Sequence, residues 1–177
     1  MELSTFISDA FSNELQVNIL VGGKFYAVKA PTAKQYIKIL GILGVGLLDE
    51  IVDKFNAEPD KIASILKILT AKDFSKDDPE ELKTAFSEII HLAQASDYFN
   101  QVPKRKKAKE SKIIGGKTIS GQITSFMEDL GMSLNEVLNT SYPLLLIMQH
   151  DKVRIDYDSK DEIKEISGKE MLKRKRG

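Results

Sequence analysis

Residues 15–32 read LQVNILVGGKFYAVKAPT and carry the clearest structural pattern in the chain. The first seven of these residues largely alternate apolar and polar side chains, which is the period of a half-buried β-strand. Gly22 and Gly23 then tolerate the positive φ angles of a tight hairpin turn, and residues 24–29 return as a second strand. Because an isolated hairpin is only marginally stable, we expect this one to pack against helices or to join another sheet.

Helical signals dominate the rest of the chain. Thr32 and Gln35 have the spacing of a capping box, and apolar side chains follow at helical spacing as far as Leu47 and Ile51. Similar starts, each followed by apolar residues at helical spacing, occur at Pro59, at Asp78 with a helix expected to about Phe99, at Ser120, at Ser133 with Glu136, and at Pro143. The sequence therefore predicts a mainly α fold, a multi-helix domain with one N-terminal β-hairpin.

Charge divides the chain, although its 26 basic and 26 acidic side chains cancel. Residues 101–117 hold seven basic residues and a single acid, with a proline and a glycine pair, which is typical of a flexible basic connector. Residues 1–100 then contain the hairpin and the first helices, and residues 118–177 contain the C-terminal helices and a charged tail. We expect one domain overall, because 177 residues are too few for two well-buried cores.

Composition and the first residues indicate a soluble protein of the cytoplasm. Cysteine is absent, so neither a disulfide framework nor a thiolate metal site can form. The longest apolar stretch, Ile39 to Leu48, is far shorter than the roughly 20 residues that span a bilayer. Acids at Glu2 and Asp9 and the lack of a basic start argue against a secretory signal. We therefore expect a cytoplasmic protein with no membrane partner.

Motifs for catalysis and metal binding are incomplete. Residues 116–118 read Gly-Lys-Thr, the end of a phosphate-binding loop, but Ser111 stands where that loop needs a glycine. The two histidines, His91 and His150, have no acid or second histidine at metal-ligand spacing, and no Gly-x-Ser-x-Gly motif occurs. We expect no catalytic residues, no metal site and no cofactor, and we interpret the histidines as packing or surface residues.

The basic segment has a functional and a structural interpretation. Lys104, Arg105, Lys106 and Lys107 are candidate contacts for a polyanion such as nucleic acid. No aromatic residue is interleaved there to stack on single-stranded bases, so we favour a solvated loop and expect no nucleic-acid partner. The alternative function that these residues support is a small nucleic-acid-binding regulator. Zero net charge with such local asymmetry also favours self-association or a protein partner.

The order of the elements along the chain is characteristic. A hairpin with residues 23–28, GKFYAV, runs into residues 30–32, APT, and a helix; several helices follow, then a late helix with residues 142–145, YPLL, and a charged tail. This order resembles that of the tail assembly chaperones of long-tailed bacteriophages. The resemblance implies a cytoplasmic protein without catalytic residues that coats the long helical tape measure protein before the tail tube polymerises around it. A structural tail or connector component of the virion is a further alternative.

The segment that begins at Pro143 supplies the candidate partner contacts. It is apolar nearly all round at its start, which is more than a single buried face requires. Helical proteins bind partner helices in apolar grooves between their own helices. We therefore expect Tyr142, Leu145 and Met148 to contact a long helical partner such as a tape measure protein. The alternative is that this segment forms the central helix of the core.

Overall fold

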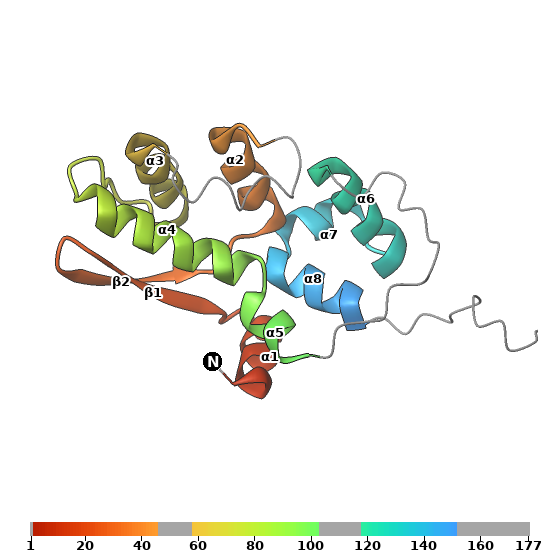
Figure 1. Cartoon of the computed structure of the whole chain (residues 1–177). Helices are drawn as coiled ribbons and strands as arrows, with labels where there is room; N and C mark the ends of the chain where they lie inside the picture. The colour runs from red at the N-terminus through yellow and green to blue at the C-terminus, as the bar shows by residue number, and fades with distance from the viewer. Residues whose placement is uncertain (1, 46–57, 103–117, 152–177) are drawn as a thin grey trace, which may run out of the picture. The chain divides into compact units, whose positions relative to one another are not determined.

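The computed structural model describes residues 2–45, 58–102 and 118–151, which belong to one compact unit. Within these residues it contains eight helices and one antiparallel hairpin, which confirms the mainly α fold with an N-terminal β-hairpin (Figure 1). In chain order the elements are α1 (Leu3–Phe11), β1 (Gln16–Val21), β2 (Lys24–Lys29), α2 (Ala33–Leu43), α3 (Pro59–Thr70), α4 (Pro79–Ala93), α5 (Ser96–Gln101), α6 (Ile119–Leu130), α7 (Leu134–Asn139) and α8 (Tyr142–Asp151).

The hairpin turns at Gly22 and Gly23, as predicted. Both glycines have positive φ angles, 58° and 68°, which is the geometry of a two-residue primed turn. The turn aligns all six residues of β1 with the six residues of β2 in an antiparallel register. At the tip, the Gly22 N–H donates a hydrogen bond to Glu81 Oε2 at 2.7 Å, which ties the turn to α4.

Side chains alternate between the two faces of the hairpin. Ile19, Val21 and Val28 are buried on the inner face, where β1 packs against α4 and β2 against α3. Leu20 and Phe25 lie on the opposite face and are exposed. In the described part of the chain, helices therefore cover one face of the two-stranded sheet (Figure 1).

The predicted capping residues begin their helices. The Thr32 N–H donates to Gln35 Oε1 at 2.9 Å, and the Gln35 N–H donates to Thr32 Oγ1 at 3.2 Å. Ser133 and Glu136 form the same reciprocal pair, and the hydrogen bonds from Ser133 lower the pKa of the Glu136 carboxyl. Asp78 caps α4 through its carboxylate. These bonds satisfy amides that lack an intrahelical acceptor, so local sequence sets the starts of α2, α4 and α7.

Two helices end earlier than predicted. α2 stops at Leu43 because Gly44 adopts a left-handed conformation with φ of 67°; Leu47 lies outside the described residues. The helix predicted from Asp78 to about Phe99 is instead two helices, α4 and α5, because Ala95 between them has a φ of 52°. A left-handed alanine costs roughly 1–2 kcal/mol, so packing rather than local preference imposes this break.

The N-terminal helix α1 was not among the predicted elements. Its N-cap residue, Glu2, makes no side-chain capping bond, and only Phe6 and Ala10 on it are buried. Short isolated helices are marginal in water, and most of their stability in proteins comes from tertiary packing. α1 packs against α5 and α8, so segments far along the chain stabilise it.

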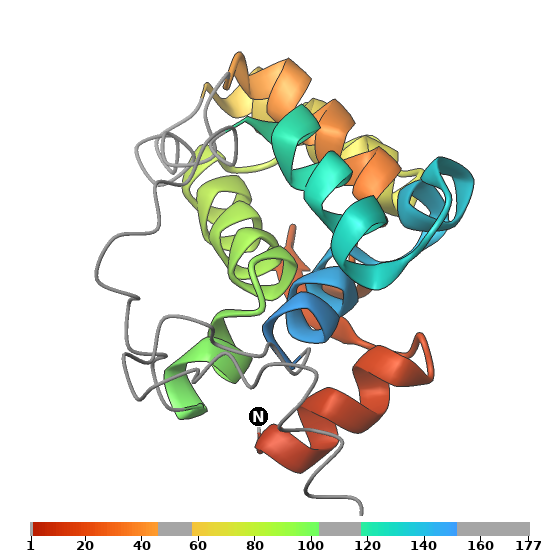
Figure 2. The same cartoon turned by 90° about the vertical axis from the view of Figure 1, so that its right-hand side faces the viewer.

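Two clusters of buried side chains make up the core. The larger cluster joins the inner face of the hairpin to α2, α3, α4, α6, α7 and the start of α8, with Tyr36, Phe86 and Phe126 among its fully buried members. The smaller cluster holds Phe6 of α1 and Tyr98 of α5. α8 contributes to both clusters and packs against α1, α4 and α6 (Figure 2).

Candidate protein-binding surface

The predicted partner contacts on α8 lie in the core. Tyr142 and Leu145 are 3% and 0% exposed and belong to the larger cluster, Ile147 belongs to the smaller one, and Met148 is half-buried. The expectation that Tyr142 and Leu145 contact a partner therefore does not fit this structure. α8 is apolar nearly all round because three helices, α1, α4 and α6, pack on it. The alternative of a central core helix agrees with this packing.

Tyr142 is held at the start of α8 by a second tyrosine. Its ring stacks on that of Tyr36 with centroids 4.0 Å apart and planes 19° apart, and its N–H donates to Pro31 O at 2.8 Å. Burial raises the pKa of Tyr36 to about 12. Burial also raises the pKa of Tyr142, and the neighbouring Tyr36 adds to that shift. Both hydroxyls are protonated at neutral pH, so the pair stabilises the core in its uncharged form.

The two histidines have different surroundings. His91 is exposed on α4, whereas His150 Nδ1 lies 3.0 Å from the Tyr98 hydroxyl and 3.0 Å from Asp151 Oδ1. The Tyr98 hydroxyl also donates a hydrogen bond to Asp151, so this group links the end of α8 to α5. Among the described residues, no group of three or more His, Cys, Asp or Glu side chains could hold a metal ion.

Other predicted features fall outside the described residues or take a structural role. Lys104, Arg105, Lys106 and Lys107 lie outside them, as do most of the connector and the charged tail. Thr118, the last residue of the Gly-Lys-Thr sequence, is the N-cap of α6 and accepts a hydrogen bond from an amide of its first turn. No helix in the described ranges is long and apolar enough to cross a bilayer.

The outer face of the hairpin carries an exposed apolar pair. Phe25 is 75% exposed and Leu20 is 45% exposed, and the two residues are cross-strand partners. The other large hydrophobic residues exposed on the described surface are Phe11 on α1 and Leu134 on α7. Of these four exposed side chains, Leu20 and Phe25 are the two that lie next to each other.

An acidic cleft lies beside the Leu20–Phe25 pair. It has a volume of about 310 Å³ and lies between β1 and α4. Glu80, Glu81 and Glu88 of α4 line it together with the apolar pair. Lys83 Nζ is paired with Glu80 Oε1 at 2.7 Å, so Glu81 and Glu88 carry the cleft's unbalanced negative charge. Such a surface is complementary to an apolar segment flanked by basic side chains.

Strand alternation in residues 16–20 is the sequence signal for this surface. Gln16 and Asn18 define the polar face of β1, and Leu20 is the next residue on that same face. The two-residue turn then places Phe25 directly opposite Leu20. Two large apolar side chains on the solvent face of a hairpin are readable from sequence once the turn is assigned, because strand side chains alternate strictly.

Comparison with known proteins adds no assignment. The chain matches no protein-family model, no curated protein and no solved structure. A functional interpretation therefore depends on the order of the elements and on the surfaces of the described residues.

Proposed function

We propose that this protein is a phage tail assembly chaperone, a non-enzymatic protein that binds the tape measure protein in the host cytoplasm before tail tube polymerisation. The order of the elements supports the proposal, because a hairpin that runs directly into a helix at Thr32, followed by several helices, is the order on which the resemblance was based. The observation that carries the proposal is the exposed Leu20–Phe25 pair beside the acidic cleft.

The Leu20–Phe25 pair is suited to the apolar stripe of an amphipathic helix. Burying one such side chain is worth roughly 1.5–3 kcal/mol relative to leaving it exposed, and the cost of association offsets much of this gain. A single contact of this size gives weak and reversible binding. A long helical client with a repeated apolar stripe binds many copies, and each copy remains releasable when the tube assembles.

The acids of α4 add a preference about the client. The Glu81 carboxylate accepts a hydrogen bond from the Gly22 N–H at the hairpin tip. Glu88 lies about two helical turns further along α4 and lines the same cleft. Basic side chains beside the apolar stripe of the client meet these carboxylates. Because α4 carries the acids on a rigid element, they orient the client helix along the cleft rather than across it.

Co-expression with an amphipathic tape measure fragment tests the proposal. We expect the fragment to co-purify at both low and high salt, because apolar contacts are not screened by ions. The double variant Leu20→Ser/Phe25→Ser should bind the fragment about tenfold more weakly or worse, because a loss of about 1.4 kcal/mol of binding free energy already weakens binding tenfold. Phe11→Ser is the matched control, because Phe11 is 61% exposed but lies on α1, and it should retain as much fragment as the natural protein.

The two alternative functions predict other outcomes. A nucleic-acid-binding regulator retains nucleic acid at low salt, loses it steeply as salt rises, and loses it when Lys104 to Lys107 are replaced. A structural tail component stays in the finished particle, where a chaperone is absent. Retention of nucleic acid alone, or equal loss of the fragment in the Phe11→Ser and the double variant, contradicts the chaperone proposal. Circular dichroism spectra of each variant exclude misfolding as the cause.

A further inference from the structure

Among the described residues, β2 has no strand beside it on the side away from β1. The described chain contains a two-stranded sheet, and antiparallel strands alternate between residue pairs that exchange hydrogen bonds and pairs that do not. The Ala30 N–H donates to Leu15 O at 2.8 Å, so every second residue before Ala30 is also bonded to β1. The residues between them, Phe25, Ala27 and Lys29, therefore direct their N–H and C=O groups away from β1.

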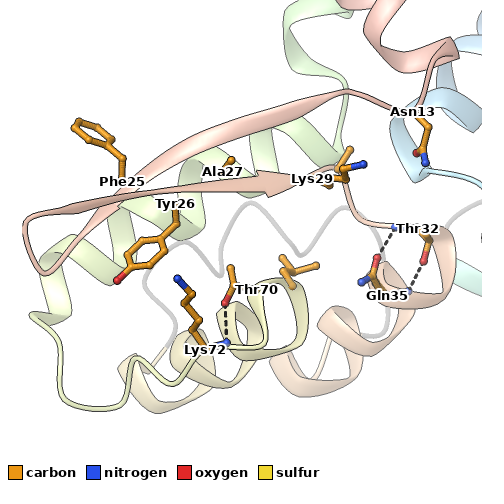
Figure 3. Close-up of a pocket in the computed structure, with 11 residues that line it drawn as sticks. Asn13, Phe25, Tyr26, Ala27, Lys29, Thr32, Gln35, Thr70 and Lys72 are labelled. Carbon is orange, nitrogen blue, oxygen red and sulfur yellow. Dashed lines mark hydrogen bonds between the residues drawn. The ribbon is translucent and has the colours of Figure 1, made fainter.

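A groove follows this edge. Within residues 2–45, 58–102 and 118–151, no hydrogen bond reaches the backbone groups of Phe25, Ala27 or Lys29. Beside them lies a groove of about 510 Å³, between β2 and the neighbouring ends of α2 and α3 (Figure 3). A row of unpaired strand groups is a template for another strand, and the groove provides the space for one.

The groove carries positive charge. Lys29 and Lys72 line it, and no aspartate or glutamate is among the described residues that do so. Lys72 Nζ lies 4.4 Å from the centre of the Tyr26 ring, a cation–π contact that holds the ammonium group beside the strand edge. Figure 3 shows Tyr26 directed toward Lys72 and Phe25 directed to the other side of the strand. Carboxylates are the groups that complement this charge.

We propose that the free edge of β2 binds an extended segment of a partner protein that carries acidic side chains at alternate positions. The segment adds a third strand to the hairpin, and its backbone pairs with Phe25, Ala27 and Lys29. Alternate side chains of a strand share one face, so its carboxylates lie on the face that carries Tyr26, next to Lys72. This site is separate from the acidic cleft beside β1, takes a segment of opposite charge, and does not depend on the chaperone proposal.

The charge of β2 disfavours a second copy of the chain as the occupant of this edge. β2 carries a lysine at each end, Lys24 and Lys29, and no acidic residue, so pairing it with β2 of another copy gathers like charges along one short edge. Such edge lysines protect against self-pairing and leave an acidic strand as the favoured occupant.

An NMR titration of the ¹⁵N-labelled full chain tests the site. The probe is a synthetic heptapeptide of alternating glutamate and valine with both ends blocked. We expect the amide signals of Phe25, Ala27 and Lys29 to shift, and those of Asn18 and Leu20 on β1 to shift little. Titration to about 5 mM peptide covers dissociation constants near 1 mM, as weak a complex as a single short strand forms. Shifts absent at that concentration, or spread evenly over both strands, overturn the proposal.

Two single proline variants, one on each strand, distinguish backbone pairing at the edge of β2 from general charge attraction. Ala27→Pro removes an outward N–H of β2 that makes no bond to β1, a change that edge strands tolerate, and it should weaken peptide binding about tenfold or more. Asn18→Pro is the matched control, because Asn18 is the register partner of Ala27 and faces the other edge; it should bind as the natural chain does. Equal loss in both variants overturns the proposal.

Changes to the peptide leave the protein untouched and so do not depend on variant folding. A heptapeptide with methyl groups on the backbone nitrogens of two adjacent central residues should not bind. Successive N–H groups point to opposite edges of a strand, so the two methyl groups block both edges of the peptide. A lysine–valine heptapeptide should not bind either, and Lys72→Glu should weaken the glutamate peptide several-fold. Equal binding of the methylated or the lysine peptide overturns strand addition or the charge preference, respectively. Concentration-dependent shifts of the β2 amides without peptide identify a second copy as the occupant, which also contradicts the proposal.

Discussion

Replacing Leu145 with alanine is expected to lower the free energy of unfolding by about 2–5 kcal/mol. Leu145 is 0% exposed within the larger cluster, so truncation removes its transfer free energy and leaves a cavity where α8 packs on its neighbours. Because small domains have total stabilities of about 5–15 kcal/mol, the loss is a large part of the whole. Urea denaturation followed by circular dichroism measures it as a lower midpoint with an unchanged slope.

Met148→Ala is the matched control for that change. Met148 lies one turn further along the same helix and is half-buried, so less apolar area is lost and we expect a loss below about 2 kcal/mol. If Leu145→Ala left the urea midpoint unchanged and weakened partner binding, α8 would be the contact helix that the sequence first indicated, and its assignment to the core would be wrong.

Strongly alkaline solution is expected to destabilise the fold through the stacked tyrosines. Burial raises the pKa of Tyr36 from 10.0 to about 12 and raises that of Tyr142 as well. The folded state therefore keeps both hydroxyls protonated at a pH where the unfolded chain releases their protons. Their stabilising effect is complete below pH 10 and is lost as the pH rises through the folded-state pKa. Two pKa units at Tyr36 correspond to about 3 kcal/mol.

Thermal melts at about pH 8 and about pH 11 check this dependence. The double variant Tyr36→Phe/Tyr142→Phe keeps both rings and their stacking but has no hydroxyl to ionise. We expect its midpoint to fall less between the two pH values than that of the natural chain. Equal falls would mean that other groups, such as lysines losing their charge, dominate the alkaline transition.

Local sequence determined the hairpin and several helix starts. Gly22-Gly23 between two alternating runs specifies one turn type and therefore one register. Thr32 with Gln35 and Ser133 with Glu136 are complete capping boxes whose partners lie three residues apart. Features of this kind need no long-range contact, so they are readable from a few neighbouring residues.

Features that depend on packing could not be read in the same way. Ala95 interrupts a continuous helical pattern without a glycine or proline because Leu92 and Tyr98 on either side of it enter the smaller cluster. α1 has no cap signal, since its stability comes from α5 and α8. An all-apolar helix start at Pro143 fits both an exposed groove and a core helix, and only the positions of α1, α4 and α6 decide between them.

The candidate surface was partly readable from the sequence. Leu20 and Phe25 are specified by strand alternation and turn length, so their exposure on one face follows from residues 15–29 alone. Their neighbours in the acidic cleft come from α4, which lies about 60 residues further along the chain. No local pattern shows that Glu80, Glu81 and Glu88 line the same cleft as these two side chains.

Photo-crosslinking from the hairpin tests most directly whether this surface captures a helical client. A photoreactive phenylalanine analogue is placed at Phe25 and, as a matched control, at Leu134, which is 49% exposed on α7; each protein is irradiated with the tape measure fragment bound. The chaperone account predicts that the fragment crosslinks from position 25 and not from position 134, with the crosslinks falling on its apolar stripe. Crosslinks from position 134 alone, or from neither position while the fragment still co-purifies, would contradict it.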